Sequence, residues 1–598
     1  MTSAPASEVP ASARPWAAEW RSRLWLGAFA LLYAALVFGG YRLGASGSWC
    51  CDDTQILSHA LRFAPWRYFV EPEAWRALIP FSLTPWLSLS YRIDLALFGL
   101  DPAGFFVHQR LALAACAWLI HLLTWRAAGH LAAACGASLF LAGVSTAQAS
   151  QLLIVRHYVE GLLALLLCLW LMQQQAAGRP RAWRAAAMAL SFAVAASAKE
   201  VYLPLGLCVL LVANGSWPQR LRLAAPVLLM MVLYIPWRAY MLGELVGGYT
   251  PSGDLGAASL LQRAGKQLAA APSFLFSHPV AALSALALLL ALGLARRWRV
   301  DGRAVALRVL LACLVVLGLL LVPLLPLTVF PGIERGSERY LFAAWATLAL
   351  VIAASCGAAM RGRAWPARSL VAALALGVAA SAWPLAQRSL TETRATQREH
   401  QAHFERLTRG GELDIVVASP SIAAWFIQGA LALRPALGHG GPPPTVVVDE
   451  AQLLGLPEGR RIWHDDGQGT QMVDAGAAVE VRLADWRARL RVRPLQVTMR
   501  HDGPSLVLRW DMQAPGDPGG GHFTLVGPGE RLAVPMPAGA LRIEQPLPRC
   551  FRIRHDAADG SVAYSAWLRL PMARDRSSAL QWAGPSEDLQ ALSAQPRC

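Results

Sequence analysis

The chain has 598 residues, of which 55% are hydrophobic and 15% are charged, and it contains 23 tryptophans. This composition excludes a large soluble protein and indicates a polytopic membrane protein. The formal net charge is +16. Many arginines fall between apolar runs, as expected for cytoplasmic loops, so the charge does not indicate nucleic-acid binding.

Apolar runs predict about eleven transmembrane helices, and the two on either side of residues 199–200 are short for a span, which needs about 20 residues. Arginines gather in alternate loops, which places those loops in the cytoplasm, the N-terminus inside and the C-terminus outside. The first run also has features of a signal peptide. When it is counted as a transmembrane helix, however, all the arginine-rich loops fall on the same side of the membrane. The predicted segments are 24–43, 104–125, 131–147, 157–174, 184–198, 200–213, 223–243, 275–295, 304–325, 340–358 and 366–385.

The composition changes at both ends of this apolar region. Residues 1–20 are rich in Ala, Pro and Ser and predict a disordered cytoplasmic terminus. Residues 21–390 form the predicted membrane domain, with a large first outer loop at 44–103 in which aromatic and arginine residues alternate, as in helices at a membrane interface. Residues 391–411 form a predicted polar linker, which is helical from Thr391 to Leu407.

Residues 412–598 predict an extracytoplasmic α/β or β-rich domain. Two aliphatic runs, 413–417 and 445–448, predict buried strands around a helix at 423–433. Alternating runs separated by Gly, Pro and Asp then predict an antiparallel sheet or small sandwich. These runs are 479–483, 506–510 and 551–554.

Asp52 and Asp53 follow the first apolar segment directly, where the chain leaves the membrane. A carboxylate beside hydrocarbon is costly unless a solvated or charged site accepts it, so the pair is a candidate functional site. The alternative is a polar loop that only ends the first helix.

Ionisable residues also occur at the outer ends of several later helices. Each alone is explained by a structural ion pair or a side chain that reaches the interface. Together they predict a polar cavity open to the outer face. They are Arg156, His157, Glu160, Lys199, Glu200, Arg238, Glu338, Arg339 and Tyr340.

Six of the ten cysteines lie in apolar segments, whereas Cys50, Cys51, Cys550 and Cys598 fall on the predicted outer side. That side permits disulfides such as Cys550–Cys598, but the pairing stays open. The spacing of cysteines and histidines matches no common zinc motif.

The Asp pair and the polar motifs at the helix ends, taken in chain order, resemble those of the GT-C glycosyltransferases. These are membrane enzymes that use polyprenyl-phosphate-linked sugars. The motifs are most similar to those of the transmembrane mannosyltransferases that elsewhere carry tetratricopeptide repeats, although no such repeat is present here. The resemblance covers roughly residues 24–390. It rests on Asp52-Asp53, Phe98-Gly99-Leu100-Asp101-Pro102 with His108 and His121, Arg156 with Glu160, Ala198-Lys199-Glu200, Tyr234 with Arg238, and Glu338-Arg339-Tyr340-Leu341.

This resemblance implies an inverting enzyme in which Asp52, with Asp53, removes a proton from an acceptor hydroxyl. It implies binding of the donor phosphate by Arg339 and Tyr340, with Arg238, Lys199 and Arg156 as further candidates. The supporting residues would be Glu200, His108, Glu160, His157 and Glu338. Family members differ in metal use, so a divalent cation at the Asp52–Asp53 loop stays open.

The leading hypothesis is therefore a transferase of a bacterial inner membrane, with its C-terminal domain in the periplasm. Its partners would be membrane lipids, a polyprenyl-phosphate-linked sugar donor and a periplasmic acceptor, and no nucleic acid. One alternative is a transporter or flippase of lipid-linked glycans, which should carry polar residues on both leaflets. Another is an inactive membrane anchor that presents the C-terminal domain, for which the Asp pair would be dispensable.

Overall fold

The computed structural model describes most of the chain. The described residues are 14–41, 47–79, 82–177, 181–212, 216–243, 265, 269–321, 338–419, 422–455, 461–465, 470–491, 495–502, 507–514, 521–527, 530–534, 538–542, 550–569 and 578–583.

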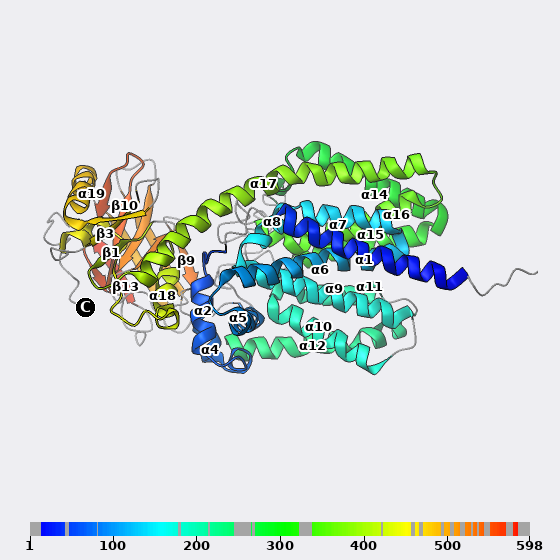
Figure 1. Ribbon diagram of the computed structural model, residues 1–598, viewed down its shortest axis with the longest axis horizontal. Helices are drawn as coiled ribbons and strands as arrows, with labels where there is room; N and C mark the ends of the chain where they lie inside the picture. Colours follow the sequence, from blue (N-terminus) through cyan, green and yellow to red (C-terminus); the bar gives the residue numbers. More distant parts are fainter. Residues whose placement is uncertain are drawn as a thin grey trace, which may run out of the picture.

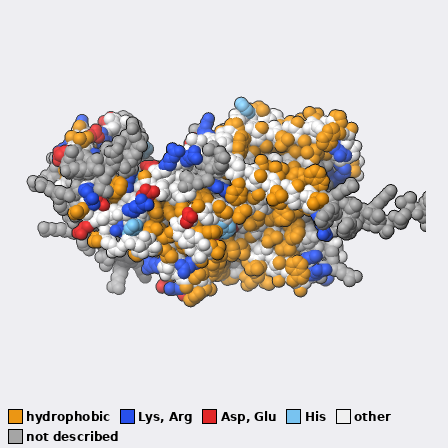
Figure 2. All heavy atoms as spheres, viewed as in Figure 1, with side chains coloured by type: hydrophobic (Ala, Val, Ile, Leu, Met, Phe, Trp, Pro, Cys, Tyr) orange, Lys and Arg blue, Asp and Glu red, His pale blue; other side chains and the backbone are white. Residues whose placement is uncertain are grey.

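A bundle of long helices forms one end of the molecule, and a strand-rich domain forms the other (Figure 1). Figure 2 shows apolar side chains covering the visible face of the bundle, as expected for a surface in contact with lipid. The bundle helices are α1 (Arg14–Gly40), α6 (Pro102–Ala128), α7 (His130–Ala142), α8 (Val144–Gln151), α9 (Arg156–Ala177), α10 (Ala182–Ala198), α11 (Val209–Val212), α12 (Trp217–Leu242), α14 (Pro279–Asp301), α15 (Arg303–Leu321), α16 (Phe342–Met360) and α17 (Trp365–Arg409).

Among the described residues, seven helices are long and apolar enough to cross a membrane, and an eighth if α7 and α8, bent by 60°, form one span. The shorter apolar helices include Ala182–Ala198, Glu200–Leu211 and Val305–Val316. Each of the eleven predicted segments therefore contains helix, but not each is a full-length span. The protein is a multi-pass helical membrane protein with a strand-rich C-terminal region, as the sequence predicts.

The first outer loop folds into four helices on the bundle. They are α2 (Asp53–Arg62), α3 (Arg67–Val70), α4 (Pro72–Arg76) and α5 (Pro85–Phe98). Their aromatic residues Tyr68, Trp75 and Tyr91 are fully buried. The loop is thus a packed part of the protein with its own core.

Helix α17 connects the two ends of the molecule without a break (Figure 1). Its first half packs in the bundle, and the same helix continues through residues 391–409 to the C-terminal domain. A continuous helix limits the relative motion of the bundle and the C-terminal domain. It also places the C-terminal domain next to the first outer loop.

The C-terminal domain begins with a four-stranded sheet of order β2-β1-β3-β4. Strand β1 (Asp414–Val417) pairs in parallel with β2 (Thr445–Val447) and β3 (Arg461–Asp465), and β4 (Thr470–Asp474) is antiparallel to β3. The helix α18 (Ala424–Leu433) lies between β1 and β2 in the chain, as predicted.

Two further sheets are antiparallel where their strands pair, as the alternating runs predict. One has the order β11-β10-β7-β8, with β12 paired to β10, and the other has the order β13-β5-β6-β9. Their strands are β5 (Gln496–Asp502), β6 (Val507–Gln513), β7 (His522–Gly527), β8 (Glu530–Val534), β9 (Ala538–Arg542), β10 (Cys550–Asp556), β11 (Val562–Tyr564), β12 (Leu568–Arg569) and β13 (Ser578–Ala583).

The prediction of a strand at 479–483 is wrong, because this run lies in helix α19 (Ala475–Arg489). Leu483 and Trp486 are buried three residues apart, on one face of the helix. Val and charged residues alternate here over only five positions, which is too short a run to distinguish the two-residue period of a strand from the 3.6-residue period of a helix.

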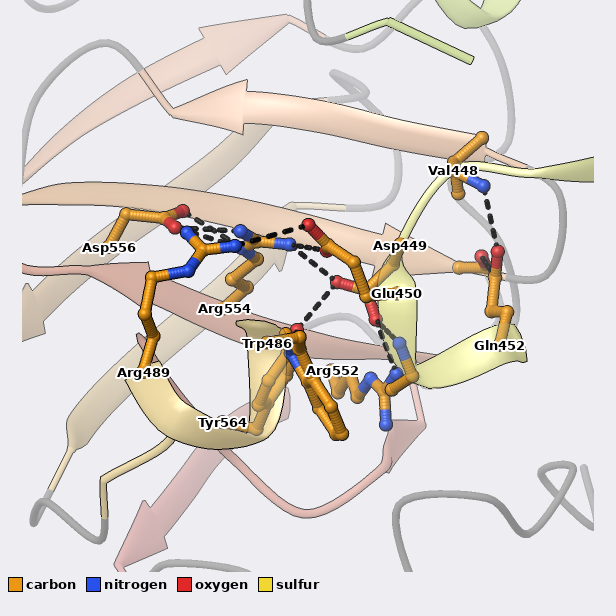
Figure 3. Close-up of polar contacts among 12 residues, drawn as sticks. Val448, Asp449, Glu450, Gln452, Trp486, Arg489, Arg552, Arg554, Asp556 and Tyr564 are labelled. Atoms are coloured by element: carbon orange, nitrogen blue, oxygen red, sulfur yellow. Dashed lines mark hydrogen bonds and ion pairs between the residues drawn. The ribbon is translucent and has the colours of Figure 1, made fainter. Parts of the chain in front are cut away.

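A buried ionic network joins the first sheet to the second (Figure 3). Asp449, just after β2, accepts hydrogen bonds from Arg552 (2.7 Å), Arg554 (3.0 Å) and the Tyr564 hydroxyl (2.8 Å). Trp486 of α19 donates its indole N–H to Tyr564 (3.1 Å). Removal of one partner would leave a buried charge uncompensated, so the network ties both sheets into one domain.

Candidate functional site

Asp52 and Asp53 lie at the N-terminus of α2, within the first outer loop. Their carboxylates contact different partners. Asp53 is 1% exposed and accepts hydrogen bonds from the Cys50 backbone N–H (2.9 Å) and the Tyr91 hydroxyl (2.7 Å). Asp52 instead accepts a hydrogen bond from the indole Nε1–H of Trp425 (2.6 Å). The two adjacent acids therefore have different surroundings.

Burial raises the pKa of both carboxyls above the ordinary value of an aspartate. Burial raises the pKa of Asp53 to about 7, although its two hydrogen bonds act in the opposite direction. Burial also raises the pKa of Asp52, opposed by the Trp425 hydrogen bond and by the charges of Arg339 and His400. A carboxyl whose pKa lies closer to the working pH is a better general base.

Helix α5 supports Asp53 through residues that the sequence analysis did not single out. Tyr91 holds Asp53, and the guanidinium of Arg156 lies over the Tyr91 ring, 5.0 Å from its centroid. Arg156 is fully buried, forms an ion pair with Asp94, and donates to Ser90 (3.2 Å). These contacts give Arg156 a supporting place behind Asp53, where both of its terminal NH2 groups donate hydrogen bonds within the protein.

His108 and Glu160 complete this charged cluster. His108 contacts Asp94 through Nδ1 (2.9 Å) and Glu160 through Nε2 (3.5 Å). Glu160 also accepts hydrogen bonds from Trp86 (2.7 Å) and Ser90 (2.7 Å). Trp86, Ser90 and Asp94 are spaced by four residues on α5, which is the signal that could have identified this helix face.

Lys199 and Arg339 come together on the other side of the site, beside two aromatic rings. The ammonium of Lys199 lies 5.1 Å from the Tyr158 ring centroid, and the guanidinium of Arg339 lies 5.0 Å from that of Tyr340. The two rings contact each other edge to face at 6.4 Å, and the positive charge of Arg339 acts unfavourably on Lys199. A phosphate bound between these two cations would offset their repulsion and accept hydrogen bonds from both.

The bend between α7 and α8 positions Arg339, which lies in the short helix η7 (Glu338–Leu341). Gln148 of α8 accepts a hydrogen bond from the Arg339 backbone N–H (2.8 Å) and donates one to the Glu338 carboxylate (2.6 Å). Ser145 donates to the Glu338 carbonyl (2.8 Å). Glu338 thus holds the helix that carries Arg339.

The remaining predicted residues surround this centre. Glu200 accepts hydrogen bonds from Arg238 (2.7 Å) and Tyr234 (3.3 Å), so Arg238 is engaged in an ion pair. His157 is buried and its ring lies 4.6 Å from that of Tyr158. The structure places the twelve predicted residues toward the end of the bundle that faces the C-terminal domain, but in separate clusters.

The C-terminal domain contributes directly to the site, which the sequence analysis did not foresee. Besides the bond from Trp425 to Asp52, the Thr54 hydroxyl donates to the Phe426 carbonyl (2.8 Å). Helix α18 packs so closely on α2 that a Cβ at Gly429 would lie 2.5 Å from the Thr54 carbonyl carbon. These contacts join residues more than 370 positions apart, and no local pattern reveals them.

An open cleft of about 440 Å³ lies between α2 and α18, next to Trp425. Its lining combines an aromatic ring, an arginine and several amide and hydroxyl groups. The lining residues include Gln55, Ser58, His59, Arg62, Phe63, Trp425 and Gln428.

Comparisons with known proteins give the following. No family model and no curated protein matches the chain. Among solved structures it aligns with ArnT from Cupriavidus metallidurans in the apo state, at 12% identity and a TM-score of 0.42, over 74% of this chain and 94% of that one. The same protein bound to undecaprenyl phosphate aligns at 14% identity and a TM-score of 0.41, over 71% and 90%.

The Cys550–Cys598 pairing involves a residue outside the described part of the chain. In the acidic loop considered for a divalent cation, each carboxylate oxygen of Asp53 accepts a hydrogen bond from within the protein. A different set of metal-binding side chains, Cys50, Cys51 and His400, lies beside Asp52.

Proposed function

We propose that this protein is an inverting GT-C-type glycosyltransferase that moves a sugar from a polyprenyl-phosphate or pyrophosphate carrier to a hydroxyl acceptor. One observation carries the proposal: the Asp52 carboxylate feels the positive charge of Arg339 and accepts a hydrogen bond from Trp425, which lines an open cleft. A general base between an anion site and an entry path is what this chemistry requires. The order of motifs resembling the transmembrane mannosyltransferases supports the same assignment.

In this mechanism the donor phosphate binds between Lys199 and Arg339, which is consistent with their mutual repulsion and their place near the membrane. Asp52 removes the proton of the acceptor hydroxyl as its oxygen attacks the anomeric carbon. The bond between this carbon and the phosphate oxygen breaks with its electron pair on oxygen. The two cations stabilise the charge that develops there, and attack opposite the leaving group inverts the configuration.

The cleft between α2 and α18 is the proposed acceptor site. Aromatic faces next to amide and hydroxyl groups suit a ligand with both apolar and hydrogen-bonding surfaces, such as a saccharide. The proposed location is a bacterial inner membrane, with this site on the periplasmic face. The arginine-rich loops at the opposite ends of the helices support that orientation.

The decisive experiment replaces Asp52 by Asn in the full-length protein. The change keeps the size of the side chain but removes its basicity, so transfer should fall by about 10²–10⁴-fold. Transfer is measured with purified protein from a polyprenyl-phosphate-linked sugar to envelope extracts, at equal protein level. Asp485→Asn is the matched control, since Asp485 is an exposed carboxylate paired with Arg489 in the C-terminal domain.

The proposal fails if the Asp52→Asn/Asp53→Asn double variant, present at normal levels in the membrane, still produces the full glycosylated product. That result would favour the inactive anchor or a transporter, neither of which needs a base at this position.

A further inference from the structure

We propose that Cys50, Cys51 and His400 form a binding site for one Zn²⁺ ion beside Asp52. The two thiols come directly before the acidic pair in the chain. The imidazole belongs to the second half of α17, which continues beyond the bundle. One ligand atom from each residue lies within 4.8 Å of the others. The site goes beyond the proposed transfer reaction, and its evidence is independent of that reaction.

The imidazole is arranged as a metal ligand. The Nδ1 of His400 lies 2.9 Å from the Thr396 carbonyl, which can only accept a hydrogen bond. Nδ1 therefore carries the proton, and Nε2 keeps its lone pair. This backbone contact is the usual outer support of a metal-binding histidine, and the ring is also fixed edge to face against Phe426 at 4.9 Å.

The backbone brings two adjacent thiols to one side. Successive side chains of an extended chain point to opposite faces. Cys51 instead has a φ of +61°, the only positive φ of a non-glycine residue in the described chain. Such a conformation is strained and persists where the surroundings require it. Here it places both sulfur atoms near His400.

The donor set selects the class of metal. Two sulfur donors and one imidazole suit zinc, whereas magnesium and calcium prefer oxygen donors. Cys50 and His400 are buried and Cys51 is partly exposed, so an ion can be shielded but still reached. The ion would tie the first outer loop to α17.

The test measures zinc in the full-length protein, purified in detergent without a metal-affinity tag. Elemental analysis should find about one zinc ion per chain, and exchange with Co²⁺ should give thiolate-to-cobalt charge-transfer absorption. Cys50→Ser and His400→Gln should each lower the zinc content at least about tenfold. The control Cys208→Ser changes a partly exposed cysteine outside the cluster and should leave it unchanged.

Wild-type protein that neither contains zinc nor takes up Zn²⁺ or Co²⁺ would overturn the proposal, whatever the stability of the variants. A vicinal disulfide would overturn it as well, and would appear as two thiols that are alkylated only after reduction. Asp52→Asn should keep its zinc while it loses transfer, so the two proposals can fail separately.

Discussion

At the scale of single residues, Asp52 and Asp53 show how neighbours in sequence acquire different chemistry. Asp53 is enclosed by α5 and receives both of its hydrogen bonds from the membrane part of the protein. Asp52 faces the C-terminal domain, where it is bonded to Trp425, one of the residues that line the cleft. We propose Asp52 as the base because its carboxylate contacts the C-terminal domain, whereas both oxygens of Asp53 are held by the membrane part of the protein.

The raised pKa of Asp53 predicts a pH-dependent contribution to stability. Its pKa lies near 7 in the folded protein and near 3.8 when unfolded, so between these values the folded chain binds the extra proton. The contribution is complete below about pH 4 and is lost as the pH rises through about 7. The Tm of wild type should therefore fall relative to that of Asp53→Asn between about pH 4 and about pH 7, because the Asn side chain stays neutral throughout.

Thermal unfolding in detergent, followed at several pH values, checks this prediction. Asp485→Asn should follow the wild-type curve across the same range, because that carboxylate is exposed. Parallel curves for wild type and Asp53→Asn would show that Asp53 does not retain a proton on folding.

At the scale of elements, the close contact of α18 with α2 decides where Trp425 lies. Glycine at position 429 allows this approach, since a Cβ would lie within 2.7 Å of three Thr54 and Gln55 backbone atoms. The backbone of α2 cannot yield as a flexible side chain would. A larger residue must therefore move the helices apart.

Gly429→Ala should separate Trp425 from Asp52 and lower transfer by about 10²-fold, the usual effect of a displacement near 1 Å at a catalytic group. The membrane level of the protein should stay normal, because the bundle is untouched. Gly440→Ala is the matched control, since a Cβ there meets no atom within 4 Å. Equal transfer by both variants would remove α18 from the site.

At the scale of the whole molecule, the site is shared by a membrane bundle and a C-terminal domain connected by α17. This arrangement works only if the domain lies on the same side of the membrane as the Asp pair. The arginine-rich ends of α14 and α15 lie on the opposite side in the predicted topology. The orientation can be measured directly.

A phosphatase that is active only outside the cytoplasm should be active when fused after Gly410, at the end of α17. The same reporter fused after Gly302, between α14 and α15, should be inactive, because Arg296, Arg297, Arg299 and Arg303 keep that loop inside. Activity in the reverse order would place the candidate site in the cytoplasm and invalidate the proposed donor.

The sequence by itself determined the class of protein, because the lengths of apolar runs and the arginine-rich loops report directly on the membrane. It also selected Asp52, Lys199 and Arg339 as candidate site residues, since ionisable residues from several helices are predicted at one end of the bundle. The tertiary structure alone decided which of these residues meet. Burial of Arg156 behind Tyr91, the contact of Trp425 with Asp52, and the approach of His400 to Cys50 join segments far apart in the chain. Such contacts depend on packing between elements, which no local periodicity encodes.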